Sequence, residues 1–140
     1  INFISFYKEI SKNDNCVENF TYDQILPYLI KKPTCTRYSS PWIASPINQQ
    51  NNYVRELKES NPNFLIYKSG SSHLDGIPMI ERLKIVNEYI LSEYELFKTF
   101  DIYEIYTKKK KIKIYFQRSI HSRLVITAFG SNFNSLSIFL

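Results

Sequence analysis

The sequence predicts a small α/β domain with a mixed sheet, in which two central parallel strands are followed by a C-terminal antiparallel hairpin and helices cover the sheet. Three observations support this prediction. Short continuous apolar runs indicate buried strands, apolar residues spaced by three and four indicate helices, and a late alternating segment indicates a hairpin. With 140 residues, of which 44% are hydrophobic and 16% aromatic, the chain can form one core.

The first third of the chain is predicted to form a helix, a strand and a second helix. Asn2 to Lys12 has helical spacing of apolar residues, and Cys16 to Thr21 reads as a short strand. Tyr22 to Lys32 is predicted to be a helix that accommodates Pro27 in its early turns. The residues expected to face inward from it are Ile25, Leu26, Leu29 and Ile30.

The segment from Pro33 to Gln50 has no helical or strand period, and its three prolines favour an extended path across the surface. We expect it to display Arg37, Tyr38 and Trp42 as a candidate binding surface. The alternative is that Tyr38 and Trp42 only cover the core.

A helix is predicted from Pro46 to about Ser60, with Ser45 as its cap and Pro46 in its first turn. Its core side is marked by Ile47, Val54 and Leu57. Phe64 to Tyr67 is short and continuously apolar, as expected for a parallel strand that is buried on both faces.

Pro78 is predicted to start the last helix. Its core residues are expected to be Met79, Ile80, Leu83, Val86, Ile90 and Leu91. Glu95 to Phe100 and Ile102 to Tyr106 then form the hairpin, with Asp101 at the turn.

The predicted domain covers residues 1–117, and residues 118–140 form a C-terminal tail. Residues 108–117 alternate apolar and polar side chains, so we expect them to extend the second hairpin strand. The tail is expected to be poorly ordered or to add a marginal edge strand at Leu124 to Phe129.

Cys16 and Cys35 flank the second helix without the spacing of a zinc site. We expect them to lie close in space, within the ~7 Å between Cα atoms that a disulfide requires. Two buried thiols are the alternative. No metal and no other cofactor is expected.

The net charge of +5 is concentrated in Lys108 to Lys113. This run either is a solvated flank of the last strand or contacts anionic groups. Nucleic acid is not an expected partner, because the aromatic residues follow amphipathic periods and do not alternate with basic residues.

Polar residues follow several predicted strands and gather, we expect, at the carboxyl edge of the sheet. The candidates for binding are His73, Asp75, Arg82 and Arg37, with Glu81 nearby. A His and Asp pair without a nucleophile in a glycine-containing elbow makes a small soluble hydrolase a distant third hypothesis.

Several sequence words occur here in a familiar order: CVENFTYDQILPYLIKKPTCTRYSSPW, FLIYKS, ERLKIVNEYILSEYE and YEIYTKK. Together they resemble the soluble C-terminal domain of polytopic membrane glycosyltransferases of the GT-C class, similar to protein mannosyltransferases and arabinose-lipid A transferases. The resemblance covers roughly Ser11 to Lys110.

The resemblance implies that the chain is part of a longer protein and lies on the extracytoplasmic side of a bacterial membrane, periplasmic or at the cell surface. It implies a non-catalytic role, packed on the membrane-embedded part of the same chain and supporting an acceptor site for a polyprenyl-phosphate-linked sugar or a glycan. The catalytic acidic residue of that class has no match here. The alternative is a free-standing α/β binding domain that recognises anionic groups through Lys108 to Lys113.

Overall fold

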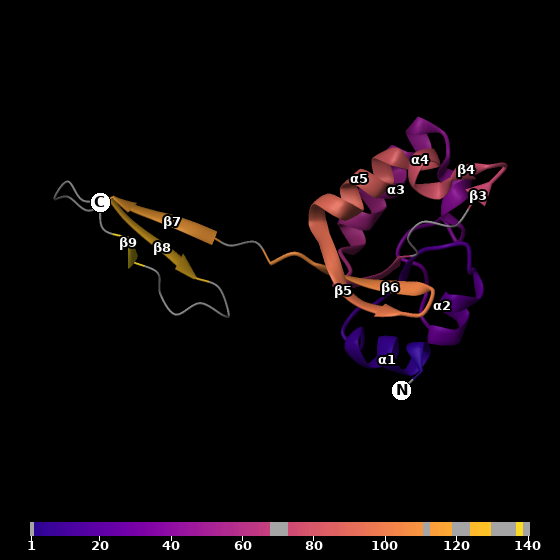
Figure 1. Cartoon of the computed structure of the whole chain (residues 1–140), viewed down its shortest axis with the longest axis horizontal. Coiled ribbons are helices and arrows are strands. Elements are labelled where there is room, and N and C mark those ends of the chain that lie inside the picture. The colour runs from indigo at the N-terminus through magenta and orange to yellow at the C-terminus, as the bar shows by residue number, and fades with distance from the viewer. Residues whose placement is uncertain (1, 68–72, 111–112, 119–123, 130–136, 139–140) are drawn as a thin grey trace. The chain divides into compact units, whose positions relative to one another are not determined.

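The computed structural model describes residues 2–67, 73–110, 113–118, 124–129 and 137–138. It divides into two compact units, Ile1–Lys109 and Lys110–Leu140 (Figure 1). The boundary expected at residue 117 therefore falls inside the second unit.

A four-stranded mixed sheet forms the centre of the first unit, with the strand order β1-β2-β6-β5. β1 (Glu18–Phe20) and β2 (Phe64–Tyr67) are parallel neighbours, which confirms the predicted pair. β5 (Tyr94–Phe100) and β6 (Tyr103–Lys108) form the predicted antiparallel hairpin, and β6 pairs with β2. The predicted α/β class with a mixed sheet is therefore confirmed.

Helices cover both faces of this sheet (Figure 1). α3 (Ile47–Ser60), α4 (Met79–Arg82) and α5 (Lys84–Glu93) lie on one face, and α1 (Phe3–Ile10) and α2 (Ile25–Ile30) lie on the other. Over the described residues, no helix combines the length and the hydropathy that crossing a bilayer requires.

Each face of the sheet has its own core, and β2 contributes to both because successive strand side chains point to opposite faces. Leu65 packs in the core under α3 and α5, whereas Ile66 packs in the core under α1 and α2. This explains the continuous apolar run of β2. The second core buries Tyr7, Val17, Leu26, Ile30, Ile66 and Ile105.

The start of α3 differs from the prediction. Ser45 does not cap the helix, because its hydroxyl donates to the Trp42 carbonyl at 2.5 Å, and Pro46 takes the cap position without a side-chain hydrogen bond. Ile47 was expected on the core side but is 70% exposed. The buried face begins one turn later, with Gln50, Tyr53 and Leu57.

The helix predicted after Pro78 is two helices, α4 and α5, separated at Leu83. Leu83 has φ −112° and ψ 46°, which is not helical, and its side chain is fully buried. Leu91, also expected in the core, is 44% exposed. A short hairpin of β3 (His73–Leu74) and β4 (Ile77–Pro78) precedes α4.

The second unit is an antiparallel sheet with the order β7-β8-β9. Its strands are β7 (Lys113–Arg118), β8 (Leu124–Phe129) and β9 (Ser137–Ile138). The prediction that residues 108–117 extend the hairpin strand is wrong, since β6 ends at Lys108 and β7 pairs with β8. Alternation identifies a strand but not its partner. The strand expected at Leu124 to Phe129 is present as β8, but it lies between β7 and β9 and is therefore not the edge strand that was expected.

Candidate docking surface

The carboxyl ends of the two parallel strands lie side by side, since Phe20 of β1 is in register with Tyr67 of β2. The hairpin turn between β5 and β6 reaches the same end of the sheet (Figure 1). There the Tyr103 hydroxyl donates a hydrogen bond of 2.5 Å to the Asp23 carboxylate, just before α2. These contacts tie α2 to the hairpin.

A short 3₁₀ helix, η1 (Pro41–Ala44), is tied to α2 by a second side-chain contact. The Gln24 amide donates a hydrogen bond of 2.9 Å to the hydroxyl of Ser40, the residue before η1. α2, η1 and the hairpin turn therefore form one end of the first unit.

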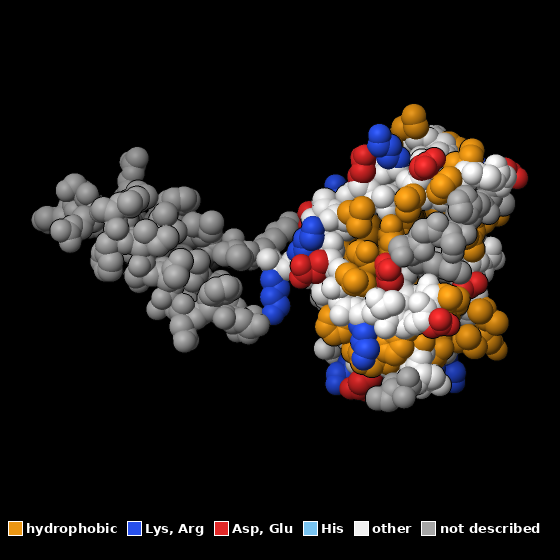
Figure 2. Space-filling model, in the orientation of Figure 1, with side chains coloured by type: hydrophobic (Ala, Val, Ile, Leu, Met, Phe, Trp, Pro, Cys, Tyr) orange, Lys and Arg blue, Asp and Glu red, His pale blue; other side chains and the backbone are white. Residues whose placement is uncertain are grey.

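This end carries most of the exposed large apolar side chains of the described residues. We call them the apolar end: Ile25, Tyr28 and Leu29 of α2, Trp42 and Ile43 of η1, and Ile102 of the hairpin turn. Figure 2 shows hydrophobic side chains gathered over the position of α2 at the lower right of the first unit.

One face of α2 is exposed although it was predicted to be buried. Ile25 and Leu29 were expected to face inward, but they are 59% and 40% exposed, and Tyr28 beside them is 80% exposed. These three residues share one helix face because they are spaced by three and four. Leu26 and Ile30, on the opposite face, fill the core instead.

The two aromatic residues of the loop have different roles. Tyr38 is buried, stacks on Tyr53 with ring centroids 5.2 Å apart, and donates to Gln49 at 2.5 Å. The expectation that it is displayed is therefore wrong, and the alternative, that it covers the core, holds for it. Trp42 is 38% exposed and is displayed at the apolar end.

Arg37 is exposed but engaged with α3. Its Nε lies 2.5 Å from Glu56 Oε1, and its backbone N–H donates to Glu56 Oε2 at 2.9 Å. Glu56 is six residues, or about 9 Å, from Gln50 along α3. Arg37 therefore contacts the middle of α3 and lies away from Gln50, whose hydrogen bonds are described next.

Gln50 brings the end of the loop and the break between α4 and α5 together. Its side-chain amide donates to the Ser45 and Arg82 carbonyls at 2.9 and 3.1 Å, and its carbonyl accepts from the Ile85 N–H at 3.0 Å. Gln50 is 5% exposed, so these bonds lie away from water. Sequence reasoning did not identify this residue, because a polar residue inside a helix gives no sign of what it contacts.

The predicted polar cluster is only partly assembled in the described residues. Arg82 lies 4.0 Å from Asp75, whose positive φ of 54° places it in the turn between β3 and β4. The backbone of His73 pairs with Pro78 in that hairpin, but its side chain lies outside what the structure describes. Of the predicted residues, the structure therefore pairs Asp75 with Arg82, whereas Arg37 contacts Glu56 of α3.

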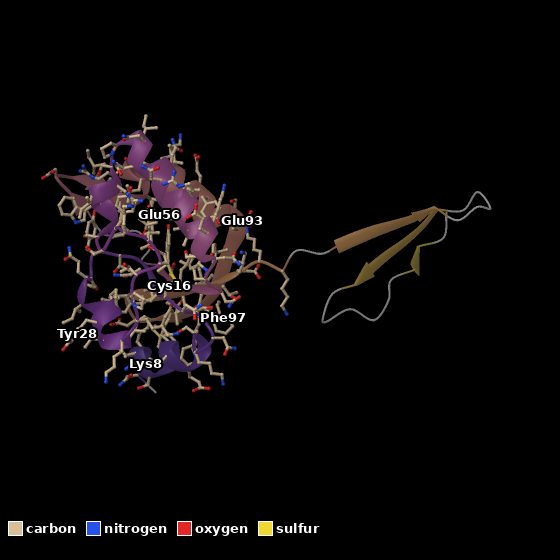
Figure 3. All side chains as sticks on the ribbon, turned by 180° about the vertical axis from the view of Figure 1, so that it is seen from behind. Lys8, Cys16, Tyr28, Glu56, Glu93 and Phe97 are labelled. Carbon is tan, nitrogen blue, oxygen red and sulfur yellow. A yellow bond between two sulfur atoms is a disulfide. The ribbon has the colours of Figure 1, made fainter. Side chains whose placement is uncertain are left out.

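The disulfide between Cys16 and Cys35 holds the loop against β1. The two Cα atoms are 4.9 Å apart, which is within the ~7 Å that a disulfide requires and confirms that the two cysteines lie close in space. Beside it Val17 forms a parallel bridge with Thr34, with the Val17 N–H donating to Pro33 at 2.9 Å and the Cys35 N–H donating to Val17 at 3.1 Å. Figure 3 labels Cys16 within the first unit.

Glu18, directly after this bridge, is the buried acidic residue that the sequence analysis missed. It is 1% exposed and accepts a hydrogen bond from the Tyr53 hydroxyl. Burial raises the pKa of its carboxyl to about 7, against the lowering effect of hydrogen bonds from Tyr53 and its neighbours. The only feature of the sequence that could have indicated this buried acid is the presence of a charged residue inside the predicted strand CVENFT.

The basic run after β6 is partly used by the fold. Lys109 Nζ donates to the Leu91 and Ser92 carbonyls at 2.7 and 3.2 Å, which are unpaired groups at the end of α5, and Lys108 Nζ donates to Asn61. An anion would have to compete with these contacts. The hypothesis that Lys108 to Lys113 binds anionic groups stays a prediction.

No three His, Cys, Asp or Glu side chains of the described residues are grouped so that they could hold a metal ion. Comparisons of the chain with models of protein families, with curated proteins and with solved structures find no match. The resemblance to glycosyltransferase domains therefore depends on the sequence words themselves.

Proposed function

We propose that this domain is a non-catalytic extracytoplasmic part of a polytopic membrane glycosyltransferase that uses a polyprenyl-phosphate-linked sugar. In this proposal the apolar end packs on the membrane-embedded part of the same chain and supports the acceptor site. The observation that carries the proposal is the exposure of the α2 stripe and of Trp42 and Ile43 on segments that a disulfide holds in place.

Exposed apolar side chains that gather on one surface usually mark a site of contact with a protein or a membrane. Trp42 and Tyr28 fit such a site well, because each offers a large apolar ring with a polar group at its edge. The hydrogen bonds of Gln24 and Tyr103 hold α2, η1 and the hairpin turn together, so the surface is formed before any partner binds.

The disulfide supports the proposed location. Disulfides persist mainly in oxidising compartments, such as the periplasm and the cell surface, and are rare in the cytosol. Cys16 and Cys35 are the two cysteines of the chain, and they are bonded to each other.

The direct test is photo-cross-linking in the full-length protein in its own cells. A photoreactive phenylalanine analogue replaces Trp42 in one version and Phe97 in the other. Phe97 is 48% exposed on β5, on the other side of the unit from Tyr28, and serves as the matched control (Figure 3). We expect cross-links from position 42 to hydrophobic segments of the same chain and none from position 97.

A transfer assay adds an independent measurement. We expect Ile43→Asp to lower sugar transfer by about tenfold or more, since each 1.4 kcal/mol of lost contact is a factor of ten. Leu96→Asp on β5 should leave transfer unchanged, and both variants should keep the thermal midpoint of the wild type. Cross-links from position 42 to a separate soluble protein, or a gene without hydrophobic spans, would refute the proposal.

A further inference from the structure

β5 is the open edge of the sheet in the first unit. The strand order β1-β2-β6-β5 places it at the end of the sheet, and among the described residues no strand pairs with its outer side. The opposite edge is covered, because Val17 beside β1 forms a bridge with Thr34 of the loop. An uncovered edge of seven residues presents backbone groups that another strand can bind.

The register of the sheet identifies the residues of β5 that turn toward this edge. The Lys108 N–H donates to the Asn63 carbonyl at 2.9 Å, so every second residue of β6, counted back from Lys108, faces β2 and not β5. The β5 residues paired with these positions direct their backbone groups outward, and they are Tyr94, Leu96 and Thr99. The Tyr94 N–H already donates to the Ile90 carbonyl at the end of α5, which leaves the Tyr94 carbonyl for another partner.

A β-bulge at Phe97 changes the phase of this edge. The register with β6 shifts between Leu96 and Lys98, so Phe97 is an extra residue in β5. In a regular strand, residues that are an odd number of positions apart turn to opposite edges. The extra residue turns Tyr94 and Thr99 to the same edge, although they are an odd number of positions apart.

We propose that the outer edge of β5 binds a second copy of this chain. The two β5 strands run antiparallel around a twofold axis that is perpendicular to the sheet and passes between Leu96 and Phe97. In this pairing the Thr99 N–H of each copy donates to the Tyr94 carbonyl of the other, and the two sheets become continuous.

The charges of β5 favour this register. Glu95 and Lys98 are both exposed, and within the described part of the chain Glu95 forms no salt bridge. In the proposed dimer Glu95 of each copy lies opposite Lys98 of the other, on the face of the sheet that α1 covers, and such opposite charges are favourable. A twofold pairing centred on Glu95 or on Lys98 places like charges opposite each other instead.

Lysines and bulges on edge strands often prevent strand pairing, so their arrangement in β5 is important. The Lys98 ammonium lies 4.4 Å from the ring centroid of Phe6 and 4.9 Å from that of Phe100. Its side chain therefore folds onto the α1 side of the sheet and does not block the edge. The bulge occurs in both copies, so the two strands have equal lengths between their paired residues.

The exposed apolar residues of β5 gain contacts in the same dimer. Leu96 is opposite Tyr106, on the α5 side of the sheet, whereas Phe97 packs against the ring of Phe64 on the α1 side. Leu96 and Phe97 are 53% and 48% exposed. Because the twofold axis keeps each face of the sheet continuous, Leu96 approaches Leu96 of the second copy on one face, and Phe97 approaches Phe97 on the other.

This dimer does not depend on the proposed function, but it is compatible with it. The exposed residues of both α2 helices point to the same side, since Leu26 and Ile30 of each helix face the joined sheet. A photoreactive group at position 97 should then join two copies of β5 and still reach no hydrophobic membrane segment. Position 97 therefore stays a valid control for position 42.

Reversal of the charges tests both the dimer and its register, and sedimentation equilibrium of the intact chain gives the dissociation constant. Glu95→Lys places a positive charge opposite Lys98, and Lys98→Glu places a negative charge opposite Glu95. We expect each variant to raise the dissociation constant roughly tenfold or more. The doubly reversed variant should regain the wild-type value, and an equimolar mixture of the two single variants should form a heterodimer, because opposite charges meet again.

Glu59→Lys makes the same change of charge at an exposed position of α3 and should leave the dissociation constant unchanged. A wild type that stays monomeric at every concentration would overturn the proposal. So would a dimer that Glu95→Lys does not weaken, because it must use another surface. The wild-type Thr99 amide gives a measurement that needs no variant, since its hydrogen exchange should slow as the protein concentration rises, and a rate independent of concentration also overturns the proposal.

Discussion

Asp14 fixes the start of β2 by binding Asn63 through both its backbone and its side chain. The Asn63 N–H lies 3.2 and 3.1 Å from the two carboxylate oxygens of Asp14, and Asn63 Nδ2 donates to Oδ1 at 2.6 Å. The Phe64 N–H also donates to Asp14, at 3.1 Å. The loop after α1 thereby satisfies backbone donors where the chain enters the sheet.

We expect Asp14→Ala to lower the free energy of unfolding by about 2 kcal/mol or more, because Asp14 is 7% exposed and its donors would lose a charged acceptor. Asp14→Asn keeps one acceptor oxygen and should cost less. Urea unfolding of the first unit measures both. Glu9→Ala, at an exposed position of α1, is the control and should stay within about 0.5 kcal/mol of the wild type.

Removing the disulfide should destabilise the domain by about 3 kcal/mol, because Cys16 and Cys35 close a loop with a sequence separation of 19. The measurement is the urea midpoint of the wild type with and without reductant. A variant with Cys16→Ser and Cys35→Ser is the control, and reductant should not change its midpoint. An oxidised wild type no more stable than this variant would show that the hydrogen bonds of Val17 alone hold the loop.

Gln50→Ala removes three hydrogen bonds at the junction of the loop with α4 and α5. We expect a loss of about 2 kcal/mol and faster amide exchange at Ile85, whose N–H loses its acceptor. Asn51→Ala, at the exposed neighbouring position, should change neither quantity. Unaltered exchange at Ile85 would mean that another group replaces Gln50.

The contact between Tyr103 and Asp23 predicts a dependence on alkaline pH. Burial, and then the hydrogen bond to Asp23, raise the pKa of Tyr103 to about 12. Because this exceeds the ordinary tyrosine value of about 10, the contribution of Tyr103 to stability is complete below pH 10 and is lost as the pH rises toward 12. The stability difference between wild type and Tyr103→Phe should shrink over that interval. Tyr28→Phe, at an exposed position, is the matched control for replacing a tyrosine by a phenylalanine.

The elements that were predicted correctly are those whose structure follows from their own residues or from their neighbours in the chain. The run from Phe64 to Tyr67 is apolar throughout, so a strand buried on both faces was the expected outcome, and β2 has a core residue on each face. The hairpin of β5 and β6 was predictable because its strands are adjacent in the chain. Such local signals do not require knowledge of distant partners.

The features that the sequence did not predict depend on distant residues. α2 has apolar residues on two faces, and Leu26 and Ile30 are the buried ones because they pack in a core with residues of other elements, among them Tyr7 and Ile66. Tyr38 is buried because Tyr53 of α3 offers a ring to stack on. In the candidate site, Gln50 and Glu18 gained their roles in the same way, from partners on other elements.

Lys109 marks the point at which other sequence can be joined to this domain. Its N–H donates to the Glu93 carbonyl at 2.8 Å and its side chain covers the end of α5, so the last residue of the first unit also completes that unit. A junction placed directly after Lys109 leaves these bonds intact, whereas a junction one residue earlier removes them. We therefore expect that recombination or gene fusion at this point keeps the bonds of Lys109 to α5.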